Sequence, residues 1–489
     1  MPWWGWLSLV ATVIGAAVGV TWYIESRFRK PAHRGDVTRL EQKVDEVRTQ
    51  VGQIAEYLDG LPQAPPETRD PFLEGRTLEQ QHKFREAIAQ YQAAFQSDTT
   101  SSQRAALHIL IGNCFLSVSE LEEAEGHYRQ AETAARQADD QRGLAAAIGN
   151  TGSVCLRRGE PEKALAHYQQ ALTIHRETGN RGDEADDVGN IGVVYKCRGE
   201  FDKALAHYQQ AVTIHRETGN RQSEANALTN MGVVYRSKGD LKKALQHHEE
   251  ALKLHRDARD RRGEATDLGN MGLVYRSMGE VERALQHHEQ AVEIDREIGY
   301  RDGEASQLGD MGSVYLTKGE PETALECYEQ ALEIHRDIGH RDGEASDLAN
   351  MGSVYLTVGD PDRALAHYEE ALRIDRQIGN RDGEASDLAN IGVVYGTKGE
   401  PDKALYYFEA GLTIHRDIGH RQGEASKLLN MGVAYWTKGE LDKALDYYQQ
   451  ALAMFEAIGA TPQVEQTKRN IQNVKTALEA RKGSEGDTV

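Results

Sequence analysis

Asparagine recurs at one position of the chain with a spacing of forty residues, and amides spaced in this way can bind a peptide backbone. Each amide carries a hydrogen-bond donor and an acceptor, so a row of them can pair with an extended chain whatever its sequence. The alternative is that each amide bonds a neighbouring helix and fixes the packing. Asp310 takes one place in this asparagine column, whose other members are Asn150, Asn190, Asn230, Asn270, Asn350, Asn390 and Asn430.

The position six residues after each asparagine changes along the chain. Basic side chains occupy it in the N-terminal half, at Lys196, Arg236 and Arg276. Apolar or small residues occupy it in the C-terminal half, at Leu316, Leu356, Gly396 and Trp436. If both positions line one groove, a ligand with an acidic segment and an apolar anchor would suit it. The alternative is that the cations pair with local glutamates.

Histidine forms a second column, and histidines can sense pH or bind metal. Its members are His175, His215, His255, His335 and His415. Each unit supplies one histidine with no second ligand four residues away, which favours a surface position or packing between helices over a metal site. The four cysteines show no C-x-x-C spacing. We therefore expect no metal and no cofactor.

No catalytic motif is present: the chain lacks a P-loop, G-x-G-x-x-G, H-E-x-x-H and G-x-S-x-G. Catalysis needs unlike residues in unlike roles at one place, whereas repeated columns offer like residues. We therefore expect that the protein is not an enzyme.

The net charge is −20, and residues 1–35 are net basic, so the remainder is more acidic still. This charge argues against a nucleic-acid partner.

The columns follow from a forty-residue period. Residues 341–380 read RDGEASDLANMGSVYLTVGDPDRALAHYEEALRIDRQIGN, and residues 381–420 read RDGEASDLANIGVVYGTKGEPDKALYYFEAGLTIHRDIGH. One glycine marks eight regular units, at Gly152, Gly192, Gly232, Gly272, Gly312, Gly352, Gly392 and Gly432. A period of this size predicts stacked supersecondary units, an α-solenoid, rather than one globular core.

Each unit has the pattern of two helices. In residues 341–380 the first apolar face ends at Gly359, and Asp360 and Pro361 are typical of a helix start. A second face follows and ends at Gly379. Small residues at fixed places let the two backbones cross closely, with tyrosines filling the gaps.

This pattern of G-x-x-Y, A-L and Y-x-x-A-L, with Pro near the turn, resembles the tetratricopeptide repeat. The forty-residue spacing is similar to the long variant in kinesin light chains and Pins-type scaffolds. Departures occur at Cys155, His248, His288, Gly411 and Arg259. The resemblance implies an all-α, right-handed superhelix whose first helices line a concave groove that binds a partner's peptide. It also implies that asparagines line this groove.

The N-terminal stretch differs from the repeats. Residues 3–24 are uncharged and would span roughly 33 Å as a helix, with Trp and Tyr at both ends. A basic cluster follows, so the positive-inside rule places the rest in the cytoplasm. We therefore expect a transmembrane helix and a single-pass location in the plasma (inner) membrane. The short anchor and near-identical repeats look bacterial.

Residues 36–61 carry apolar residues at alternating spacings of three and four, which predicts a coiled coil and a homo-oligomer through it. A different helical partner or a single amphipathic helix is the alternative. We expect a Pro-rich linker over 62–71, about ten repeats over 72–459, a capping helix over 461–482 and a disordered tail over 483–489.

Together these features predict a membrane-anchored scaffold or adaptor that binds a partner protein segment in the groove of the solenoid, without catalysis. One alternative is an assembly factor for a membrane complex that uses the outer faces. Another is a regulatory subunit of an enzyme. Replacing the asparagines distinguishes the two binding surfaces. Loss of partner binding would favour the groove, and unchanged binding by a folded variant would favour the outer faces.

Overall fold

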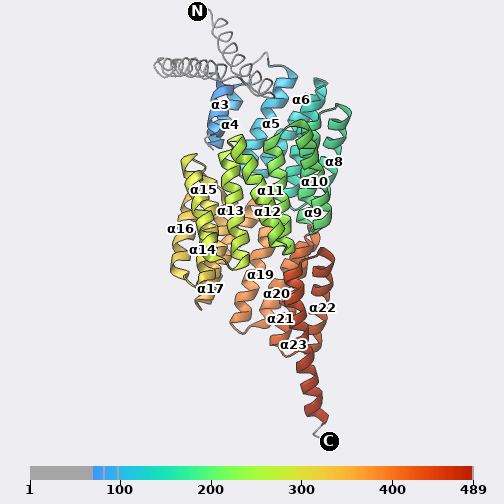
Figure 1. Ribbon diagram of the computed structural model, residues 1–489, viewed down its shortest axis with the longest axis vertical. Helices are drawn as coiled ribbons and strands as arrows, with labels where there is room; N and C mark the ends of the chain where they lie inside the picture. The colour runs from blue at the N-terminus through green and yellow to red at the C-terminus, as the bar shows by residue number, and fades with distance from the viewer. Residues whose placement is uncertain (1–69, 81–82, 96–98, 487–489) are drawn as a thin grey trace, which may run out of the picture. The chain divides into compact units, whose positions relative to one another are not determined.

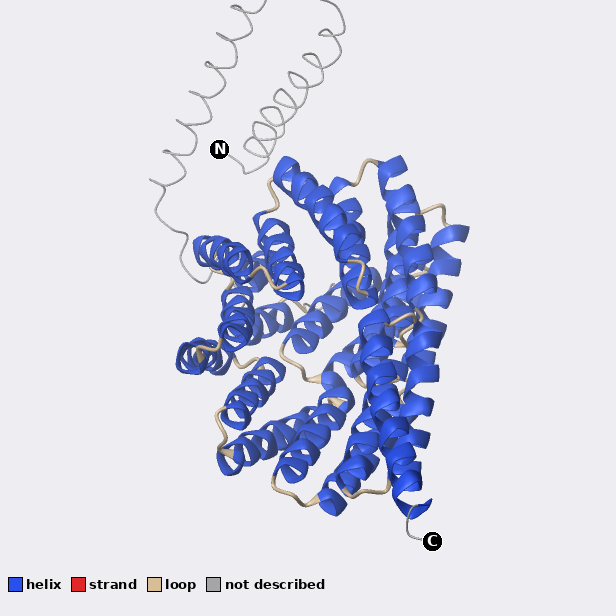
Figure 2. Cartoon of the chain, turned by 60° about the horizontal axis from the view of Figure 1, so that its bottom comes forward, coloured by secondary structure: helices blue, strands red, loops and turns tan. Residues whose placement is uncertain are grey.

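The computed structural model describes residues 70–80, 83–95 and 99–486, and in these residues every regular element is an α-helix. The helices form ten antiparallel hairpins and one final helix (Figures 1 and 2). Figure 2 shows the hairpins following one another round a curve, joined by short loops. The predicted helical-hairpin repeat is therefore confirmed.

The first helices of the hairpins are α3 (Pro71–Gln80), α5 (Ser101–Ser117), α7 (Gln141–Arg157), α9 (Arg181–Cys197), α11 (Arg221–Lys238), α13 (Arg261–Met278), α15 (Arg301–Lys318), α17 (Arg341–Thr357), α19 (Arg381–Thr397) and α21 (Arg421–Thr437). The second helices are α4 (Phe84–Ala93), α6 (Leu121–Gln137), α8 (Pro161–Glu177), α10 (Phe201–Thr218), α12 (Leu241–Ala258), α14 (Val281–Glu297), α16 (Pro321–Ile338), α18 (Pro361–Ile378), α20 (Pro401–Asp417) and α22 (Leu441–Ile458). The final helix, α23 (Thr461–Gly486), extends beyond residue 482.

Local chemistry sets the ends of the helices. Asp360 caps α18, because its side chain accepts a hydrogen bond from the Arg363 amide, and Pro361 occupies the first turn. Gly379 ends the helix with φ +70°, a left-handed conformation that costs glycine little. Arg259 takes the same role after α12 with φ +56°.

Within a hairpin, glycine in the first helix lies under an aromatic ring of the second helix. A Cβ atom on Gly192 would lie 2.8 Å from Cε1 of Tyr208, and both residues are buried. Ala204 and Ala211 flank the tyrosine with 0% and 1% exposure. The two backbones therefore approach closely, and the ring fills the space that a longer side chain would need.

An ion-pair network joins the turns between hairpins. Glu184, at the start of α9, accepts from Arg176 at 3.1 Å and from Arg181 at 2.7 Å. The same Arg–Glu–Arg arrangement recurs around Glu264 and Glu304. Burial opposes ionisation, but the two arginines hold the pKa of Glu184 below its usual value. These ion pairs therefore link the end of one hairpin to the start of the next.

The stack curves so far that its later hairpins touch its earlier ones. A Cβ atom on Gly159 would lie 2.8 Å from Cγ2 of Ile418, and one on Gly199 would lie 3.4 Å from Cγ2 of Ile458. We call this contact the seam. Figure 1 shows it where the lower ends of α9 and α10 meet the upper end of α22. The first helices of successive hairpins contact one another from α9 to α21, so they line the inner side of the curve.

The structure corrects the prediction of a transmembrane helix and of a single-pass membrane location. No helix in the described residues is long and apolar enough to cross a bilayer. The physical reason is that these helices are amphipathic; even the longest, α23, carries charges along its length. The expected span over 3–24, the coiled coil over 36–61 and residues 62–69 of the linker lie outside the described residues.

Candidate functional site

The asparagine column lies on the first helices of eight consecutive hairpins, from α7 to α21. Every member is half-buried. Among the described residues, only Asn150 has a side-chain hydrogen-bond partner: its Nδ2 donates to Oδ1 of Asn113 on α5 at 3.2 Å. The amides of the other six asparagines thus make no side-chain hydrogen bond within the described part of the protein. Since each amide has two donors and an accepting oxygen, this capacity is available to water or a ligand.

Two of the three basic residues at the neighbouring position, Arg236 and Arg276, lie near Asp310, the one acidic member of the column. Arg236 and Arg276 both lower the pKa of Asp310, although burial raises it and the net shift is upward. Burial lowers the pKa of Arg236, and its buried Nε has no hydrogen-bond partner in the described structure. None of Lys196, Arg236 and Arg276 lies within ion-pair distance of a described carboxylate. Pairing of these three cations with local glutamates is therefore not observed among the described residues.

At the C-terminal end, the same surface is apolar. Trp436 on α21 is 39% exposed. Val393 and Val433, three residues after Asn390 and Asn430, are 37% and 46% exposed. The equivalent position is serine in three other units, as in Ser353, whose hydroxyl lies 2.9 Å from the Tyr368 hydroxyl, and it is Val193, Val233 or Leu273 in the rest. The sequence did not distinguish these valines, because Val193 and Val233 stand at the same position and are less exposed.

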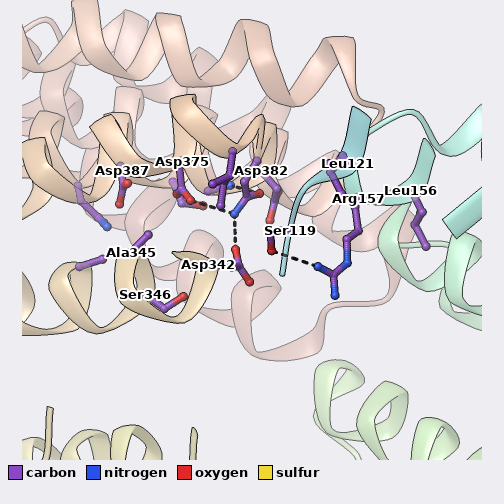
Figure 3. Close-up of a pocket in the computed structure, with 16 residues that line it drawn as sticks. Ser119, Leu121, Leu156, Arg157, Asp342, Ala345, Ser346, Asp375, Asp382 and Asp387 are labelled. Atoms are coloured by element: carbon purple, nitrogen blue, oxygen red, sulfur yellow. Dashed lines mark hydrogen bonds between the residues drawn. The ribbon is translucent and has the colours of Figure 1, made fainter. Parts of the chain in front are cut away.

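A cavity of about 560 Å³ borders the column at Asn390 (Figure 3). One wall comes from the N-terminal halves of α17 and α19 and the end of α18, and the other comes from the end of α7 and the start of α6. Burial raises the pKa of Asp375 to about 7 and that of Asp387 to about 8. Arg157, whose guanidinium donates to the Ser119 hydroxyl at 3.4 Å, lines the opposite wall. The cavity is thus polar and brings one column member close to the seam.

The histidine column lies away from this surface, buried between helices. Nδ1 of His175, His255 and His335 lies 2.7, 2.7 and 2.6 Å from Asp187, Asp267 and Asp347 respectively. In the units of His215 and His415 this aspartate is replaced by Ala227 and Lys427 respectively. These contacts join the end of a second helix to the next first helix, so they pack the hairpins together.

The fold defines the protein as an α-solenoid built from helical hairpins. The sequence matches the tetratricopeptide repeat family in overlapping segments that cover more than half of the chain. These are residues 102–177, 187–257, 224–297, 263–337, 304–377, 344–417 and 384–457. The chain belongs to the tetratricopeptide repeat family. Proteins of this family are generally binding scaffolds, and no enzymatic domain is found in the part of the chain that these matches cover.

Solved structures show similar helical repeats. The Rap conjugation gene regulator of plasmid pLS20, in complex with the Phr* peptide, is 15% identical and covers 70% of this chain and 96% of its own (TM-score 0.48). A Rap protein complexed with competence and sporulation factor is 15% identical and covers 69% and 99% (TM-score 0.42). A STAND ATPase with a tetratricopeptide repeat sensor from Pyrococcus horikoshii is 15% identical and covers 76% and 56% (TM-score 0.43). These likenesses concern the fold alone. No curated protein matches the sequence.

Proposed function

We propose that the protein is a non-catalytic scaffold that binds an extended segment of a partner protein along its inner face. The asparagine column would hold the backbone of that segment, and the position six residues later would select its side chains. The observation that carries this proposal is the column itself: six half-buried amides have no side-chain hydrogen-bond partner in the described residues. Amides that served only to fix the packing would bond a neighbouring helix.

The charges along the inner face favour one class of ligand. Lys196, Arg236 and Arg276 offer cations without close carboxylate partners, and Trp436 and Val433 offer exposed apolar surface at the other end. A segment with acidic residues toward one end and an apolar anchor toward the other would complement both. Burying the anchor against Trp436 adds apolar contact, and acidic residues of the ligand would pair with cations that make no ion pair within the described residues.

The test compares two triple variants of the full chain by affinity capture from the native host, followed by binding measurements with each captured protein. The groove variant is Asn190→Ala, Asn230→Ala and Asn270→Ala. The matched control is Gln170→Ala, Gln210→Ala and Gln290→Ala, which removes three exposed amides from the second helices. At about 0.5–1.5 kcal/mol per hydrogen bond, the groove variant should bind roughly 10- to 1,000-fold more weakly, and the control should bind normally.

Circular dichroism and thermal melting establish that both variants keep the helical fold. A partner whose affinity is unchanged in the folded groove variant would refute the proposal. Loss of affinity in the outer-face control alone would favour the assembly-factor alternative, in which folded subunits contact the outer surface.

A further inference from the structure

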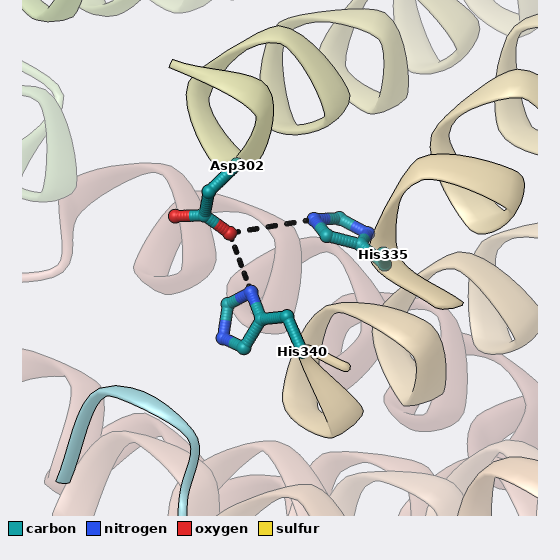
Figure 4. Close-up of side chains that lie close together, drawn as sticks. All are labelled: Asp302, His335 and His340. Carbon is teal, nitrogen blue, oxygen red and sulfur yellow. Dashed lines mark hydrogen bonds and ion pairs between the residues drawn. The ribbon is translucent and has the colours of Figure 1, made fainter. Parts of the chain in front are cut away.

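Three side chains from three helices meet at the turn between α16 and α17 (Figure 4). Asp302 lies in the first turn of α15, His335 lies in the last turn of α16, and His340 is the N-cap residue of α17. Oδ1 of Asp302 lies 2.5 Å from Nδ1 of His340 and 3.7 Å from Nε2 of His335. The three ligand-type atoms all lie within 4.8 Å of one another.

The burial and orientation of His335 suit a metal ligand. Its side chain is 4% exposed, and Nε2 is buried with no hydrogen-bond partner in the described structure. Its other nitrogen, Nδ1, lies 2.6 Å from Oδ2 of Asp347. A proton on Nδ1 that is donated to Asp347 leaves the lone pair of Nε2 directed toward Asp302. Carboxylates orient metal-binding histidines in this way and raise their basicity.

Asp302 supplies the negative charge. Burial raises the pKa of this carboxyl, but the hydrogen bond and charge of His340, together with smaller effects of Tyr300 and His335, lower it to about 2. The group is therefore ionised at neutral pH. A cavity of about 620 Å³, bordered by Asp302 and His340, gives access from one side. Two imidazoles and one carboxylate, with an open side, match the ligand set of three-residue zinc sites.

The same arrangement recurs in Asp382, His415 and His420, but without the orienting carboxylate. Lys427 takes the place of Asp347, and Nδ1 of His415 is buried without a partner. Its Nε2 lies 3.1 Å from Asp382. An ammonium group beside the imidazole also opposes a nearby cation. This second cluster is therefore the natural comparison for the first.

We propose that Asp302, His335 and His340 form a binding site for a divalent transition metal, with zinc as the best fit. Atoms bound to tetrahedral zinc lie roughly 3.3 Å apart, given zinc–ligand bonds near 2.0–2.1 Å, so His340 must move back slightly and His335 must approach. Water from the cavity takes the fourth position. Because the ligands come from α15, α16 and α17, the metal ties one hairpin to the next and stabilises that junction.

The test titrates Zn²⁺ into the untagged full chain by isothermal calorimetry at pH 8. An alkaline pH is chosen because burial lowers the pKa of His340 but Asp302 and Asp342 together raise it above its usual value, so metal must displace a proton. We expect one zinc per chain, a rise in melting temperature with zinc, and the visible absorption of tetrahedral Co²⁺ when cobalt replaces zinc. Asp347→Asn should weaken binding about 10- to 100-fold.

His340→Asn should abolish binding without unfolding the protein, because asparagine is the N-cap residue at Asn180, Asn220 and Asn380. Asp302→Gln is a second such variant, since Gln222 and Gln422 occupy the same place. The control, His420→Asn in the second cluster, should bind zinc like the wild type. The proposal is overturned if the wild type binds zinc no tighter than about 10 μM, if both ligand variants still bind, or if the control alone loses binding.

Discussion

Asp375 shows how one residue can change the local balance of charge. Five units place histidine at this position, and His335 pairs with Asp347 across the turn. Asp375 instead faces Asp387, and both side chains are buried, with 4% and 3% exposure. Burial raises the pKa of Asp375 to about 7 and that of Asp387 to about 8. The pair is therefore stable when protonated and unfavourable when both groups ionise.

Replacing Asp375 with histidine should stabilise the protein at pH 8, by roughly 2 kcal/mol. Both folded pKa values lie above the unfolded value near 3.8. The wild-type pair therefore contributes full stability below pH 4, and this contribution is lost as the pH rises through 7 and 8. Asp375→His restores the histidine–aspartate pair and removes that decline. Urea unfolding between pH 4 and 8.5 measures it.

The matched control is Asp257→His, which alters an exposed aspartate near the end of α12. It should leave the pH dependence of the wild type unchanged. Equal slopes of stability against pH in the wild type and in Asp375→His would show that the carboxyl pair ionises normally in the folded protein.

At the scale of the element, the hairpin depends on where two helices touch, and α9 offers two glycines for comparison. A Cβ atom on Gly192 would lie 2.8 and 2.9 Å from the ring of Tyr208, a buried side chain with no room to move away. A Cβ atom on Gly189 would meet nothing within 4 Å. The ring of Tyr208 therefore requires glycine at position 192. No such contact requires glycine at position 189, three residues away on the same helix.

Gly192→Ala should lower the free energy of unfolding by about 1–3 kcal/mol, because the added methyl group overpacks the hairpin. Gly189→Ala should leave it unchanged or raise it by up to about 1 kcal/mol, because alanine favours the helix and nothing obstructs it. Chemical denaturation of both variants measures the difference. A Gly192→Ala protein as stable as Gly189→Ala would mean that the close approach of α9 and α10 is not required.

At the scale of the whole molecule, the seam gives residues at equivalent positions different degrees of burial. Ile298 and Ile418 occupy the same position of their units, but Ile298 is 41% exposed and Ile418 is 8% exposed. The difference arises because Ile418 packs against Gly159, which belongs to a hairpin early in the chain. Contacts of this kind add long-range coupling to a stack that otherwise interacts only between neighbours.

Ile418→Ala should therefore destabilise the protein by about 2–4 kcal/mol, through lost burial and a cavity at the seam. Ile298→Ala, the matched substitution at an exposed site, should cost about 0.5 kcal/mol or less. Hydrogen exchange of α7 and α8 provides a second readout, since only Ile418→Ala should speed exchange there. Equal effects of the two substitutions on stability would argue against the seam.

Much of the fold could be predicted because it is encoded locally. The repeated glycine, proline and acidic caps predicted the helix ends at Gly359 and Gly379, and the apolar faces predicted the hairpin. The cluster proposed to bind metal was not predicted, because its members are not neighbours in sequence. His340 follows His335 across a turn, and Asp302 comes from the previous first helix. A search for a second ligand one helical turn away could not find them.

The sequence by itself determined the unit: a forty-residue helical hairpin whose caps, small residues and aromatic rings act within one or two repeats. Only the tertiary structure decided which copies of a position are buried and which are exposed. The curvature of a solenoid is the sum of small rotations between hairpins, and no single unit encodes that sum. The contact of Ile418 with Gly159, and the half-buried amides without partners along the inner face, depend on it.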